Sequence, residues 1–128
     1  WTSQLADEDA LGWDWFSLHF DDGRKLMAFT MYVEGSEAYT TGTLISAQGE
    51  PQTLGPDELQ ILPVNSSEVA GREVPVTWQI RIPKQQIDIT TEAFKADQWN
   101  DSRYPYYEGA ISFGGSHAGK GYMELTGY

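Results

Sequence analysis

Residues 13–33, WDWFSLHFDDGRKLMAFTMYV, give the clearest indication of the fold. Both halves of this stretch are rich in aromatic and aliphatic residues, which is typical of β-strands. They are joined by Asp22-Gly23, and glycine accepts the positive φ that a tight hairpin turn requires. The stretch therefore predicts an antiparallel β-hairpin.

Further strands follow along the rest of the chain. The clearest lies at 74–82, where Val76, Trp78 and Ile80 share one face and Gln79 lies on the other. Other strands are expected at 40–47, 52–54, 58–63, 86–94, 106–113 and 121–126. The polar stretches 64–73 and 95–105 are expected to be loops, and the glycine-rich segment 114–119 a hairpin turn.

This pattern gives about eight or nine short strands with a turn signal roughly every 8–12 residues and no segment of helical period. It indicates an all-β, antiparallel sandwich or barrel. A chain of 128 residues suits one domain of roughly 100–150 residues. We expect that domain at 13–128, preceded by a lead-in segment at 1–12.

The composition excludes several functional classes. The chain has 19 Asp and Glu against 8 Lys and Arg, a formal charge of −11, so nucleic-acid binding is not expected. There is no cysteine for disulfides, thiolate zinc sites or a nucleophile, and no apolar run approaches the ~20 residues that span a bilayer. The common catalytic motifs are missing, and the spacing of His19 and His117 suggests no metal site. We therefore expect no metal and no cofactor.

Carboxylates lie within the aromatic strands, and two of them are candidate acid–base residues. Glu108 follows two tyrosines, and Glu124 lies between Met123 and Leu125; Asp14 lies between two tryptophans. A glutamate facing a barrel interior is partly desolvated, so its pKa rises and it suits general acid or base catalysis. The alternative for each is a solvated outer position or a pair with Arg81 or Arg103.

Aromatic residues are the other chemical resource of the chain. A barrel lined with tryptophan and tyrosine can hold an apolar ligand, although simple core packing is the alternative. The candidate ligand-binding residues are Trp13, Trp15, Trp78, Gln79, Tyr107 and Tyr122.

Four separated motifs together resemble a known family. They are GWDWFSL at 12–18, WQIRIP at 78–83, YEGA at 107–110 and GYMELTGY at 121–128. In this order they resemble the C-terminal lipocalin-like domain of the AttH and carotenoid 1,2-hydratase (hydroxyneurosporene synthase) superfamily. The resemblance implies a calycin-type antiparallel β-barrel, normally one of two such domains in a longer chain.

The same resemblance implies a function for the longer protein. It would be a hydrolase, hydratase or cyclase acting on an apolar, lipid- or isoprenoid-like substrate, periplasmic or secreted, with this domain inactive alone. Glu108 and Glu124 would act as acid and base. The expected partners are an apolar small molecule, the N-terminal lipocalin-like domain and a further copy of the chain. The alternative is a non-catalytic lipocalin-like domain that binds a hydrophobic molecule or has a filled, purely structural barrel.

Overall fold

The computed structural model describes residues 10–95, 97–101 and 106–128, which form one antiparallel sheet of ten strands. The strands are β1 (Ala10–Phe20), β2 (Lys25–Val33), β3 (Tyr39–Ile45), β4 (Pro51–Leu54), β5 (Gln60–Val69), β6 (Arg72–Ile82), β7 (Ile87–Ala93), β8 (Trp99–Asn100), β9 (Tyr106–Gly115) and β10 (Gly119–Thr126). A short 3-10 helix, η2 (Pro83–Gln85), joins β6 to β7.

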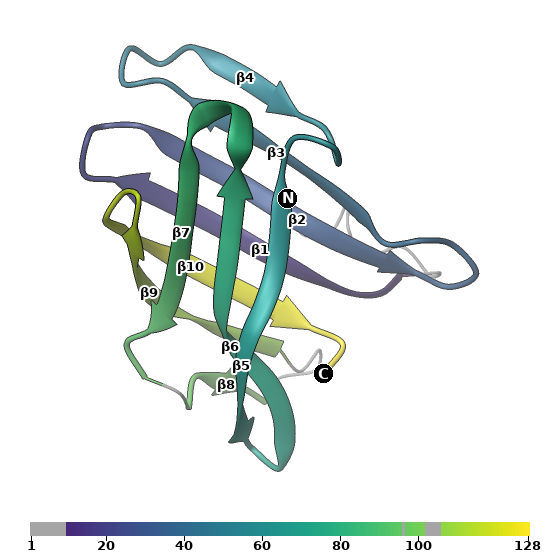
Figure 1. The fold of residues 1–128 in the computed structure, drawn as a ribbon. Helices are drawn as coiled ribbons and strands as arrows, with labels where there is room; N and C mark the ends of the chain where they lie inside the picture. The colour runs from purple at the N-terminus through teal and green to yellow at the C-terminus, as the bar shows by residue number, and fades with distance from the viewer. Residues whose placement is uncertain (1–9, 96, 102–105) are drawn as a thin grey trace.

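The sheet curls over itself into a half-barrel. Its strand order is β4-β3-β2-β1-β10-β9-β7-β6-β5, and β8 pairs with β9 beside this path. In Figure 1, β5, β6 and β7 pass in front of β1 and β10, so the two halves of the sheet face each other. This architecture confirms the predicted all-β, antiparallel, barrel-type fold.

The hairpin predicted from the opening stretch is confirmed. β1 pairs with β2 in a register that places Phe16 opposite Ala28 and His19 opposite Lys25. Gly23 has a φ of 95°, the positive value expected for the turn. β1 already begins at Ala10, so the end of the expected lead-in segment belongs to the sheet. The rest of that segment, residues 1–9, lies outside the described residues.

The prediction of a loop at 64–73 is wrong. β5 continues to Val69 and β6 starts at Arg72, so only Ala70 and Gly71, both with positive φ, form the turn. β5 is the last strand in the sheet order, and most of its side chains are exposed on both faces. Its sequence therefore lacks the apolar alternation that marks a half-buried strand. The loop expected at 95–105 contains the short strand β8.

The core fills the concave side of the half-barrel. Phe16 and Trp78 are almost fully buried and meet edge to face, with ring centroids 5.5 Å apart. The Trp78 Nε1 donates to the Pro75 carbonyl at 2.8 Å, and the hydroxyl of the buried Tyr107 donates to the Lys95 carbonyl at 2.9 Å. Large side chains with satisfied polar atoms thus occupy the side of the sheet where a lipocalin-like ligand would sit.

Candidate functional site

The face of the sheet that points away from the core carries most of the predicted site residues. In β10, Tyr122 and Glu124 alternate with the buried Met123 and Leu125, which confirms that the former share a face. We call the side of β3, β2, β1, β10 and β9 that points away from the core the outer face.

Strand register brings five of the eight predicted residues together on the outer face. Trp15 of β1 lies opposite Glu124 of β10, which lies opposite Glu108 of β9. Directly opposite residues on one face have Cβ atoms roughly 5 Å apart. Trp13 and Tyr122 belong to the neighbouring rows of the same face.

Glu124 is the carboxylate whose surroundings best suit proton transfer. It is half-buried, and the Trp13 Nε1 donates to its Oε1 at 3.2 Å. Burial raises the pKa of Glu124, the charge of Glu108 raises it further, and the hydrogen bond from Trp13 opposes both. Glu108 itself is exposed, and its hydrogen bond with Tyr106 raises the pKa of that phenol. The desolvation of Glu124 thus arises on the outer face and not in the barrel interior.

The three other predicted residues lie elsewhere. Trp78 and Tyr107 are core residues, and the Gln79 Nε2 donates to Asp88 Oδ1 at 2.9 Å on an exposed part of β6 and β7. Asp88 also pairs with Arg81 at 3.5 Å, so Arg81 serves neither glutamate. The other suggested partner, Arg103, lies outside the described residues. Catalytic and ligand-binding roles for all eight residues remain predictions.

A second carboxylate centre was not selected from the sequence. Asp14 is fully buried on the core face of β1, where it accepts hydrogen bonds from the hydroxyls of Tyr32 and Tyr128, the latter at 2.8 Å. Burial raises the pKa of Asp14 to about 6, although both hydrogen bonds act to lower it. The pKa values of Tyr32 and Tyr128 are raised as well, chiefly by burial.

The sequence contained one signal for this centre. Asp14 alternates with Phe16 and Leu18, so it had to share their buried face. The contacts of Asp14 with Tyr32 and Tyr128 depend on how β1 aligns with β2 and with the last residues of the chain. The sequence alone does not give this register.

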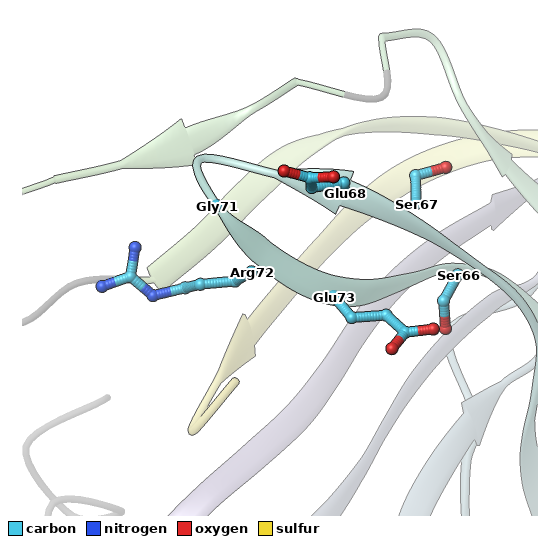
Figure 2. Close-up of a pocket in the computed structure, with 6 residues that line it drawn as sticks. All are labelled: Ser66, Ser67, Glu68, Gly71, Arg72 and Glu73. Carbon is cyan, nitrogen blue, oxygen red and sulfur yellow. The ribbon is translucent and has the colours of Figure 1, made fainter.

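A shallow, open hollow lies on the β5–β6 hairpin, away from all these residues. Its lining comprises Ser66, Ser67, Glu68, Gly71, Arg72 and Glu73. Figure 2 shows the Arg72 side chain extending away from both glutamates. Its guanidinium lies 4.4 Å from the centre of the Trp99 ring and donates to the Ala70 carbonyl at 3.3 Å. Arg72, the one basic residue that lines this hollow, therefore already interacts with groups of the protein itself.

Two further features bear on chemistry and location. Across residues 10–95, 97–101 and 106–128, no group of three or more His, Asp or Glu side chains is placed to hold a metal ion. The same part of the chain includes no helix with the length and hydropathy needed to cross a membrane.

Comparison with known proteins identifies a family and a similar solved structure. The model of the AttH-like family matches residues 1–128. A crystal structure described as a "putative AttH" from Nitrosomonas europaea is 33% identical, with a TM-score of 0.84 over 96% of this chain. The match covers 40% of that protein, so the chain spans well under half of the relative's length. A search of curated proteins finds no match.

Proposed function

Because this chain belongs to the AttH-like family and spans 40% of a solved relative, we propose that it is one domain of a larger enzyme. That enzyme acts on an apolar, lipid- or isoprenoid-like substrate as a hydrolase or hydratase. The outer face of this domain forms one wall of the substrate site. The observation that supports the proposal is the half-buried Glu124, hydrogen-bonded by Trp13 and lying beside Glu108 among aromatic side chains.

Glu124 is the proposed proton donor. A carboxyl group whose pKa is raised keeps its proton closer to neutral pH, and it can give that proton to an alkene carbon or a leaving oxygen. In the hydration of an alkene, the proton adds to one carbon, water adds to the resulting cation, and the surplus proton returns to a carboxylate. Glu108, opposite Glu124 on the neighbouring strand, is the proposed acceptor of that proton. The faces of Trp13 and Trp15 stabilise the cationic charge.

The outer face needs a second wall before it can catalyse. Tyr122 is 48% exposed, so water reaches the centre of this surface in the isolated chain. Excluding water strengthens every electrostatic interaction in a site. We assign the second wall to the remaining part of the larger protein, an N-terminal lipocalin-like domain, and expect this domain alone to be inactive. A periplasmic or secreted location also stays a prediction.

The test is made in the full-length protein with two substrates, an acyclic isoprenoid alkene and a long-chain p-nitrophenyl ester. Turnover of the alkene indicates a hydratase and turnover of the ester a hydrolase. Glu124→Gln should lower kcat by roughly 10²–10⁴-fold, the usual contribution of a general acid. Glu92→Gln, an exposed glutamate on β7, is the matched control. Unchanged rates in both Glu124→Gln and Glu108→Gln would exclude the assignment.

A non-catalytic role is the second candidate, and one observation favours it. Trp78 and Tyr107, which were expected to line a ligand cavity, are packed in the core with exposures of 1% and 0%. In this case the domain binds a hydrophobic molecule, or supports its neighbour, without chemistry. A titration with an apolar fluorophore separates the two: saturable quenching of tryptophan emission supports binding, and its absence supports a structural domain.

A further inference from the structure

The outer face contains a row of basic side chains that the proposed function does not use. In the registers of β1 with β2 and β10, His19 lies opposite both Lys25 and Lys120. All three side chains are exposed on the same face. Neighbouring strands are about 4.8 Å apart, so roughly 10 Å separates the backbones of the two lysines.

This row is unusual in so acidic a chain. Three of the ten Lys, Arg and His residues of the protein (8 and 2) lie side by side, and the like charges of the two lysines repel each other across β1. Within the described residues, neither lysine forms an ion pair. Asp22, in the turn between β1 and β2, is paired with Arg24 at 2.7 Å. A row of this kind is stabilised when an anion lies across it.

An apolar band begins next to the basic row. Its six members lie in the next three rows of the outer face, which also contain Ser17, Glu124 and Thr126. They are Met27, Tyr122, Phe29, Trp15, Met31 and Trp13. These three rows run along β1 from residue 17 to residue 13, a length of about 13 Å. The hydrocarbon core of a bilayer is ~30 Å thick and holds two chains end to end, so one acyl chain spans ~15 Å. The band matches that length.

The charges also fix the direction of a ligand on this face. Glu124 lies four residues along β10 from Lys120, about 13 Å away, and Glu108 lies beside it. The two lysines therefore attract an anionic head group at one end of the apolar band, and the two glutamates repel it at the other positions. The hydrocarbon tail carries no charge, so neither glutamate repels it.

We infer that the outer face binds a single-chain amphiphile with a carboxylate head group, the head group lying across Lys25, His19 and Lys120 and the hydrocarbon chain along the apolar band. The inference rests on the proposed function, because it assigns a substrate class to the same face. A single anion in solution interacts mainly with charged groups within the Debye length of ~8 Å, because salt screens the more distant ones. An anionic membrane, by contrast, would meet the −11 charge of the whole molecule, so a membrane is the disfavoured occupant.

The experiment compares oleate, below its critical micelle concentration, with oleyl alcohol, below its solubility limit, on the 128-residue chain. Binding is measured by the quenching of tryptophan emission. Oleate should bind more tightly than the alcohol. Lys25→Gln combined with Lys120→Gln should weaken oleate binding by about tenfold and leave the alcohol unchanged. Lys84→Gln combined with Lys95→Gln removes the same charge from exposed positions elsewhere and should change neither ligand.

The direction of the ligand is tested with spin-labelled stearic acids and amide NMR. A label near the carboxyl end should broaden the signals of Lys25 and Lys120, and a label near the methyl end those of Trp13 and Met31. Equal affinity for oleate and the alcohol on this face would overturn the carboxylate inference and leave the apolar-substrate proposal intact. Absence of both ligands from the outer face, or binding of both in the core, would overturn the carboxylate inference and the apolar-substrate proposal together.

Discussion

At the scale of single residues, Asp14 sets a pH dependence of stability. Its pKa is about 6 in the folded state against an ordinary value of 3.8, so between these values the folded state holds a proton that the unfolded state has released. A raised carboxyl pKa stabilises the fold fully below the unfolded value, and this contribution is lost as pH rises through the folded value. The Asp14 contribution therefore disappears between about pH 4 and pH 6.

Replacing Asp14 by Asn isolates this effect. The free energy of unfolding of the wild type, minus that of Asp14→Asn, should be about 2 kcal/mol larger at pH 4.5 than at pH 8, because only the wild type titrates at this position. Urea titrations of both proteins at the two pH values provide the measurement. A difference that stays constant with pH would show that Asp14 does not titrate with a raised pKa.

Tyr128 makes a second prediction about the same carboxyl group. Its hydroxyl donates to Asp14 Oδ1 and lowers the Asp14 pKa, so Tyr128→Phe should raise that pKa above 6. The carboxyl carbon signal of Asp14, followed by NMR through a pH titration, reports the change directly. Tyr122→Phe removes a hydroxyl from the outer face and should leave this titration unaltered. An equal shift in both variants would contradict the assignment.

At the scale of elements, the sequence predicted strands well where one face is buried. The β1–β2 hairpin and the alternating strand β6 were predictable because a period of two and an Asp-Gly turn mark them locally. β5 was not, because it lies at the end of the sheet order and buries almost nothing over 62–66. Its strand character comes from pairing with β6, which is a non-local cause.

The candidate site was predictable to a similar degree. Alternation predicted that Tyr122 and Glu124 share a face, but the side on which the core lies depends on what packs against the sheet. Met123 and Leu125 point to the core, so Glu124 between them lies on the opposite, outer side of β10. For Trp78 the alternative to ligand binding was core packing, and its edge-to-face contact with Phe16 in the core could not be predicted from the sequence.

Close approach of β1 and β10 makes a third prediction. A Cβ added at Gly121 would collide with the backbone oxygen of Ser17 and lie 2.9 Å from Leu18 Cδ2, whereas one added at Gly114 meets nothing within 4 Å. Gly121→Ala should therefore lower the free energy of unfolding by roughly 1–3 kcal/mol, and Gly114→Ala should change it little. Chemical denaturation of the pair measures this difference. Equal stability of the two variants would mean that β1 and β10 are farther apart than described.

At the scale of the whole molecule, two opposing effects act on the association of one copy of the chain with another. The outer face exposes Tyr39, Met27 and Tyr122, and the sheet ends in the unpaired edges of β4 and β5. Both features favour association. The formal charge of −11 opposes it, because identical molecules repel one another.

Salt should shift this balance. Since ions screen charge repulsion but leave apolar attraction in place, the 128-residue chain should associate more at 0.5 M than at 0.02 M sodium chloride. Light scattering over a concentration series measures the mass. Tyr39→Ser combined with Tyr122→Ser should reduce the association at high salt. A monomeric mass under every condition would contradict the prediction, which includes the expected homo-oligomer.

The pairing of β1 with β10 also has a consequence for folding. It joins residues more than a hundred positions apart, such as Trp13 and Thr126, in the middle of the sheet. Contacts of such high sequence separation slow folding, because a long loop must close first. A circular permutant that connects the end of β10 to the start of β1, and opens the exposed β4–β5 connection between Pro56 and Asp57, would convert this pairing into a local hairpin. Because β4 and β5 lie at opposite ends of the strand order, this opening separates no paired strands. The strand order would be unchanged, and the permuted chain would fold faster than the natural one.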